Sequence, residues 1–111
     1  MMFAVIYQGY IKTGCEDRYK KAWHTIACYF KEYRGALGSC LHQTENGLWL
    51  AYSRWPDKAT RNASWPGDDA PSDELPEDVK AAIVIVQNCL DQERKLPEIC
   101  MEVIDDMLMK T

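Results

Sequence analysis

The dipeptide Asn46-Gly47, near the middle of the chain, constrains the fold more than any other short stretch. It separates two runs of residues with β-strand character within residues 37–55. Asn-Gly is typical of a two-residue type I′ turn, because both central residues of that turn need a positive φ angle. The sequence therefore predicts a tight β-hairpin in which His42 faces Ala51.

In this register, each face of the hairpin mixes apolar, aromatic and polar side chains. One face carries Cys40, His42, Thr44, Trp49, Ala51, Ser53 and Trp55, and the other carries Ser39, Leu41, Gln43, Leu50, Tyr52 and Arg54. A hairpin with apolar and aromatic residues on both sides usually has both sides covered. We therefore expect both faces of the sheet that contains it to be covered.

Length and charge limit the class of protein. The chain has 111 residues, so we expect one domain over residues 1–111. Its net charge is −4 and it has no basic run, which argues against nucleic acid as a partner. The longest apolar run, residues 81–86, is far shorter than the ~18–20 residues of a membrane span, so we expect no membrane association. The first residues lack the basic segment and cleavage site of a signal peptide and are typical of a strand.

Five cysteines are spread widely along the chain, at Cys15, Cys28, Cys40, Cys89 and Cys100. Their number is odd, no C-x-x-C occurs, and neither histidine completes a zinc pattern with them. We therefore favour free thiols in the reducing cytoplasm over a disulfide framework or a metal site.

Hydrophobic spacing predicts the order strand, long helix, strand, strand, short helix, helix, strand. Besides the hairpin, we expect a strand over residues 2–12, helices over 16–34, 58–64 and 76–90, an acidic loop over 67–74 and a last strand over 98–108. This is the βαββαβ pattern of a ferredoxin-like α+β sandwich with an inserted short helix.

Such a sandwich places both main helices on one face of its sheet. The other face is apolar here, and leaving it in water forfeits about 25 cal/mol for each Å² that could be buried. The simplest remedy is a homodimer in which two sheets face each other. The space between them can be a packed core or a cavity for an apolar ligand.

Two stretches, LGSCLH at residues 37–42 and YSRWPDKA at residues 52–59, give the chain a resemblance to a known family. Together with the opening FAVIYQGYIKTGCEDRYKKAW and the last strand, they resemble the antibiotic biosynthesis monooxygenase (ABM) superfamily of dimeric α/β barrels. These motifs are more specific for the fold than for an activity.

The resemblance implies a homodimer with a ligand cavity between each sheet and its helices. It implies cofactor-independent oxygenation of polycyclic phenols for some members and oxidative haem degradation for others. The haem-degrading members carry a ligating histidine on the later helix, and this chain has no histidine after His42. We therefore expect no cofactor and a small apolar or aromatic ligand.

Oxygenation without a cofactor needs a water-poor pocket, a base or hydrogen-bond partner, and donors for the developing oxyanion. The family places catalytic groups on the first strand and near the short helix, which corresponds here to Tyr7, Asn62 and Trp65. The candidates are His42 as base, Tyr7, Tyr52, Asn62 and Arg54 as donors, and Trp49, Trp55 and Trp65 as pocket walls.

Each candidate also has a purely structural interpretation. The aromatic residues are typical of a packed core, His42 of a strand histidine, and Arg54 of an ion pair with a carboxylate such as those of the acidic loop. Three functions therefore stay open: a monooxygenase, a non-catalytic ligand-binding protein and a structural dimerising domain.

Overall fold

The structure is a computed structural model of the chain and describes residues 2–64 and 75–108. The elements follow in the order β1 (Phe3–Gly9), α1 (Glu16–Tyr33), β2 (Gly38–Gln43), β3 (Trp49–Trp55), α2 (Lys58–Ser64), α3 (Glu77–Cys89), a 3-10 helix (Gln92–Arg94) and β4 (Ile99–Glu102). The predicted α+β ferredoxin-like fold is confirmed, with α2 as the inserted short helix. The predicted acidic loop and Trp65 lie outside the described residues. None of the described helices has the length and apolar character needed to cross a membrane.

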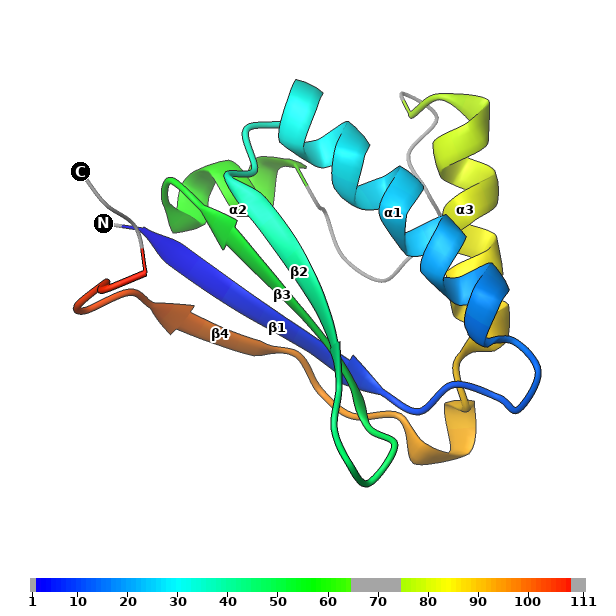
Figure 1. The fold of residues 1–111 in the computed structure, drawn as a ribbon. Coiled ribbons are helices and arrows are strands. Elements are labelled where there is room, and N and C mark those ends of the chain that lie inside the picture. Colours follow the sequence, from blue (N-terminus) through cyan, green and yellow to red (C-terminus); the bar gives the residue numbers. More distant parts are fainter. Residues whose placement is uncertain (1, 65–74, 109–111) are drawn as a thin grey trace.

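The four strands form an antiparallel sheet in the order β2-β3-β1-β4, so β3 and β1 are central. The helices α1 and α3 lie together on one face of this sheet, and α2 follows directly after β3 (Figure 1). The first and last strands pair with each other, and beyond them the Val103 N–H donates to the Met2 carbonyl at 2.9 Å.

β1 ends at Gly9, earlier than the predicted strand over residues 2–12. Beyond Gly9 the chain leaves β3 and pairs with the end of α3, where the Lys12 N–H donates to the Cys89 carbonyl at 2.8 Å. A side chain at Gly9 would meet Leu90 at 2.9 Å, so glycine permits the close approach of these two segments. β4 is also shorter than predicted and covers only Ile99–Glu102.

The β2–β3 hairpin has a three-residue loop, and the predicted two-residue turn is wrong. The Thr44 N–H donates to the Leu48 carbonyl at 2.8 Å, and the Gly47 N–H donates to the Thr44 carbonyl at 3.0 Å. Gly47 has a φ of 88°, whereas no described non-glycine residue has a positive φ, so Asn46 does not adopt the type I′ conformation. A type I turn followed by a left-handed glycine is the usual three-residue alternative.

This loop moves the β2–β3 register by one residue from the prediction. Leu41 faces Ala51, and His42 faces Leu50 instead of Ala51. Because side chains alternate along a strand, the shift turns every β2 side chain to the face opposite the predicted one. Leu41 therefore lies on the helix side of the sheet and the exposed His42 lies on the other side.

Between the sheet and the two long helices, the buried apolar side chains gather in two clusters. The larger cluster contains Phe3, Val5, Phe30, Ala36, Trp55, Leu75, Val79 and Ile83. The smaller cluster contains Tyr19, Trp49 and Cys89. The spacing of Tyr19 and Phe30 along α1 places these two aromatic residues on the same buried helix face, one in each cluster.

Candidate functional site

A cavity of about 210 Å³ lies between the sheet and the helices α1 and α3, where the two core clusters meet. It is lined by Tyr7, Gln8, Tyr19, Trp23, Ile26, Ala27, Phe30, Ala36, Ser39, Ala51, Tyr52, Ser53, Trp55, Ile83, Val86, Gln87 and Leu90. Most of these side chains are aromatic or aliphatic, and no Asp, Glu, His, Lys or Arg occurs among them. Such a wall suits an apolar aromatic ligand held by a few polar groups.

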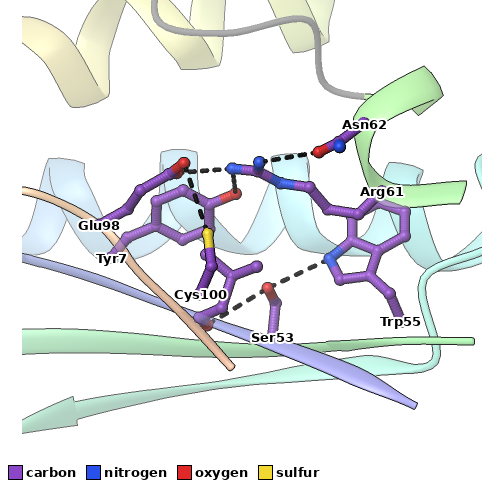
Figure 2. A network of polar contacts seen from close by, with 8 residues as sticks. Tyr7, Ser53, Trp55, Arg61, Asn62, Glu98 and Cys100 are labelled. Atoms are coloured by element: carbon purple, nitrogen blue, oxygen red, sulfur yellow. Dashed lines mark hydrogen bonds and ion pairs between the residues drawn. The ribbon is translucent and has the colours of Figure 1, made fainter. Parts of the chain in front are cut away.

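One of those polar groups, the Tyr7 hydroxyl, belongs to a network with a buried arginine (Figure 2). Arg61 Nη2 donates to the Tyr7 hydroxyl at 3.1 Å and to Glu98 Oε2 at 2.5 Å, while Nη1 donates to Asn62 Oδ1 at 3.2 Å. Arg61 comes from α2, Tyr7 from β1 and Glu98 from the residue before β4. The network therefore joins three separate parts of the chain beside the cavity.

Arg61 is 7% exposed, which is unusual for an arginine. Its Nε is buried and has no hydrogen-bond partner within the described part of the chain. The carboxylate of Glu98, whose side chain is 38% exposed, balances the positive charge of Arg61. A buried guanidinium with a spare donor is the kind of group that an oxygen atom of a ligand or a water molecule satisfies.

The short helix α2 is held in place by hydrogen bonds at both of its ends. At its start, Asp57 Oδ1 accepts from the Thr60 N–H at 2.7 Å, as a helix N-cap does. At its end, the Ser64 hydroxyl donates to the Arg34 carbonyl at 2.9 Å, and Ser64 is buried together with Arg61. The helix therefore turns Arg61 toward the sheet.

The buried phenols of Tyr7 and Tyr19 keep their protons at neutral pH. Burial raises the pKa of Tyr7, although the hydrogen bond and charge of Arg61 oppose that rise. Burial also raises the pKa of Tyr19 to about 12. The Tyr7 oxygen accepts a hydrogen bond from Arg61, which leaves its own proton to donate to a ligand.

The structure brings several of the predicted site residues to the cavity. Tyr7 and Trp55 lie on the helix side of the sheet and line it, and Trp55 Nε1 donates to the Ser53 hydroxyl at 3.3 Å, which fixes the indole ring. Tyr52 also borders the cavity, but it alternates with Ala51 and Ser53 along β3, so its side chain lies on the opposite face of the sheet. Trp49 is buried but is not a lining residue, and it packs edge-on against Tyr19 with the ring centroids 5.6 Å apart. Asn62 is exposed and contacts Arg61 at the outer side of the network.

Two further predicted site residues lie, like the Tyr52 side chain, on the opposite face of the sheet. His42 is exposed there, because of the shifted hairpin register, and it does not line the cavity. Arg54 donates to the Tyr52 hydroxyl at 3.2 Å and pairs with Asp106. The predicted ion pair of Arg54 with a carboxylate is therefore present, with Asp106 as the partner in place of a residue of the acidic loop.

Sequence analysis missed Arg61 and Glu98. Arg61 lies in the polar segment KATRNAS, where an arginine is typical of a solvated helix face. One sequence feature could have indicated that Arg61 is buried. Arg61 and Ser64 are three residues apart and so share one face of the short helix, and this is the face that packs against the sheet. No cluster of three or more potential ligands for a metal ion occurs among residues 2–64 and 75–108.

Comparison with solved structures places the fold among known proteins. A Mycobacterium tuberculosis protein, Rv0793, is 10% identical with a TM-score of 0.70 over 96% of this chain and 99% of its own. A proposed antibiotic biosynthesis monooxygenase from Chloroflexus aurantiacus is 15% identical with a TM-score of 0.70 over 96% of both chains. SnoaB, a cofactor-independent oxygenase from Streptomyces nogalater, is 6% identical with a TM-score of 0.67 over 97% of this chain and 98% of its own.

At these identities, the likeness confirms the resemblance at the level of the fold: the chain folds like the ABM proteins. No protein-family model matches the sequence, and no curated protein matches it either.

Proposed function

We propose that this protein binds a compact aromatic molecule in the cavity and oxygenates it without a cofactor. The observation that carries the proposal is an apolar cavity lined in part by Tyr7, whose hydroxyl accepts a hydrogen bond from the buried Arg61. The cavity supplies the water-poor surroundings, and the Tyr7–Arg61 pair supplies polarity at a single point.

The size and lining of the cavity define the ligand class. A volume of about 210 Å³ is below the ~300–1,000 Å³ of common ligand pockets, so the ligand is small. Trp23, Phe30 and Trp55 present aromatic surface that a fused-ring molecule can pack against. A phenol, quinol or anthrone has this shape and carries one oxygen for the Tyr7 hydroxyl.

The Tyr7–Arg61 pair also suits the chemistry. Deprotonation of an anthrone places negative charge on its oxygen, and a neutral phenol donor backed by a guanidinium stabilises that charge. The anion transfers an electron to O₂, and the two radicals combine to a hydroperoxide. Loss of water converts the CH₂ carbon to a ketone, so one O₂ gives one ketone and one water.

The proton leaves by way of water, because the described cavity lining contains no carboxylate, histidine or lysine. Catalysis therefore rests on stabilising the substrate anion. His42, the base expected from the sequence, lies on the other face of the sheet and has no part in this step. The fold shared with SnoaB, a cofactor-independent oxygenase, supports the same reaction class.

The proposal includes a homodimer formed through the sheet face opposite the helices. That face carries Ile6, Leu50 and Tyr52, which are only half-buried in the single chain. Pairing this face with that of a second copy would bury their apolar surface. Light scattering is expected to give twice the chain mass, and a monomeric mass would contradict this part of the proposal.

The test combines thermal unfolding with oxygen uptake, using anthrone and a naphthoquinol as probes. We expect the probes to raise the melting temperature and the protein to consume one O₂ for each anthrone oxidised. Tyr7→Phe removes only the hydroxyl, so turnover should fall about 10- to 100-fold, corresponding to a charge-assisted hydrogen bond of about 1.5–3 kcal/mol.

Tyr33→Phe is the matched control, because Tyr33 is 69% exposed on α1 and is not a lining residue. Full turnover in Tyr7→Phe would contradict the assigned role of the hydroxyl. Stabilisation by the probes without oxygen uptake would identify a binding protein instead of an oxygenase. If no probe raises the melting temperature and none causes oxygen uptake, both the proposed ligand binding and the proposed oxygenation are wrong.

A further inference from the structure

Two cysteine thiols meet where the start of α1 lies against the end of α3. Cys15 is the residue before α1, and Cys89 is the last residue of α3, where it is 1% exposed. Cys15 packs against the smaller core cluster, which contains Cys89. Two backbone hydrogen bonds through Lys12 hold the two residues close together. The Lys12 N–H donates to the Cys89 carbonyl at 2.8 Å, and the Cys15 N–H donates to the Lys12 carbonyl at 3.0 Å.

The two thiols have different surroundings. Arg18 Nη2 donates to the Cys15 sulfur at 3.2 Å, and this sulfur stands at the N-terminal end of the 18-residue helix α1. A guanidinium and a helix N-terminus both support negative charge on a sulfur atom. Cys89 is enclosed in the smaller core cluster, and burial, together with the nearby Cys15 side chain, raises the pKa of its thiol.

We propose that Cys15 and Cys89 form a peroxide-sensitive thiol pair that closes to a disulfide. The Cys15 sulfur attacks the peroxide, breaks the O–O bond and becomes a sulfenic acid, while the other oxygen leaves as water. The Cys89 sulfur then attacks the Cys15 sulfur and displaces the hydroxyl as a second water. Two thiols and one hydrogen peroxide thus give one disulfide and two water molecules.

The remaining cysteines provide internal controls. Cys28, Cys40 and Cys100 are all exposed. The Cys28 sulfur lies 3.4 Å from His24 Nε2, and the Cys100 thiol donates to Glu98 Oε1 at 3.8 Å. If exposure alone decided reactivity, these three thiols would oxidise before the half-buried Cys15.

Closure of the pair would act on the cavity. Val86 and Gln87 on α3 and Leu90 directly after it line the cavity, as does Tyr19, one helical turn after Cys15. A covalent link between the two helix ends would fix the separation of α1 and α3 at this end. The effect on ligand binding rests on the proposed function, whereas disulfide formation does not.

The experiment titrates the purified, reduced protein with hydrogen peroxide, blocks free thiols with a maleimide and maps the products by peptide mass spectrometry. We expect loss of two thiols, a Cys15–Cys89 cross-linked peptide and full reversal by dithiothreitol. Arg18→Gln should slow the reaction about tenfold, and Lys20→Gln, also an exposed cation on α1, should leave the rate unchanged.

Cys15→Ser should abolish the cross-link, and Cys28→Ser should leave it intact. Because Cys89 is buried and its replacement can unfold the chain, Arg18→Gln is the decisive variant. Preferential oxidation of the exposed cysteines would overturn the proposal, and so would an unchanged rate in Arg18→Gln. These readouts require no ligand turnover, so they stand apart from a failure of the oxygenase assay.

Discussion

The buried phenol of Tyr19 should make the stability of this protein depend on pH in the alkaline range. Tyr19 is 7% exposed, and burial raises its pKa from 10.0 to about 12, with a smaller contribution from the charge of Cys89. Because the folded-state pKa is the higher one, the unfolded chain loses the proton first. The stabilisation is therefore complete below about pH 10 and is lost as the pH rises toward 12.

The size of this loss follows from the two pKa values of Tyr19. A difference of about two units corresponds to roughly 3 kcal/mol in total, about half of which is lost by pH 11. Tyr19→Phe keeps the aromatic ring that packs against Trp49 but has no proton to lose. The free energy of unfolding of this variant should therefore fall less steeply with pH than that of the natural protein.

Urea unfolding at pH 8, 10 and 11 measures the difference. Other groups also titrate in this range, but they are the same in both proteins and cancel in the comparison. Tyr33→Phe is the control, since Tyr33 is 69% exposed and its removal should leave the pH dependence unchanged. Parallel stability curves for Tyr19→Phe and the natural protein would refute the assignment of a buried, neutral phenol.

Three further predictions concern the hairpin, the sheet faces and the buried arginine. Gly47→Ala should destabilise the protein by about 1–2 kcal/mol in urea unfolding, because Gly47 has a φ of 88°, whereas Asn46→Ala should cost less than about 0.5 kcal/mol. Leu41→Ala, on the helix side, should cost about 1–2 kcal/mol, whereas His42→Ala should change neither stability nor turnover. Glu98→Gln should cost about 1–2 kcal/mol by leaving Arg61 buried without a full counter-charge, a value reduced because Glu98 is 38% exposed. Equal losses of stability in Gly47→Ala and Asn46→Ala, or in Leu41→Ala and His42→Ala, would contradict the structure. An unchanged stability of Glu98→Gln would do so too.

The helices were predictable because their signals are local. The amphipathic stripe of residues 16–34 and the capping residue Asp57 before residues 58–64 lie within a few positions of the helices they define. The predicted bounds of α2 and those observed agree fully, and those of α1 differ by one residue.

The hairpin register was not predictable from its turn dipeptide, because Asn-Gly suits both a two-residue turn and a three-residue loop. The sheet decides between them. β3 is fixed by its pairing with β1, which directs Ala51 to the helix side, and the longer loop then brings Leu41 beside it and leaves the polar His42 outside. Comparing the hydrophobicity of Leu41 and His42 would have favoured the observed register.

The candidate site was predictable only in part, for a similar reason. Alternation along the first strand and the aromatic character of the third place Tyr7 and Trp55 at the cavity. Arg61 becomes a buried charge only through Glu98, 37 residues later, and Tyr7, 54 residues earlier. Such long-range pairs leave no periodic trace in the sequence.

The late position of Glu98, β4 and Asp106 in the chain has a consequence for proteolysis. Residues 98–106 supply the pairing partner of β1, the counter-charge of Arg61 and the carboxylate that binds Arg54. None of these residues lines the cavity, whose lining in the described part of the chain comes from residues up to Leu90. A single protease cut just before Glu98 would therefore leave every cavity-lining residue in place, yet would uncover a sheet edge and leave a buried cation without its counter-charge.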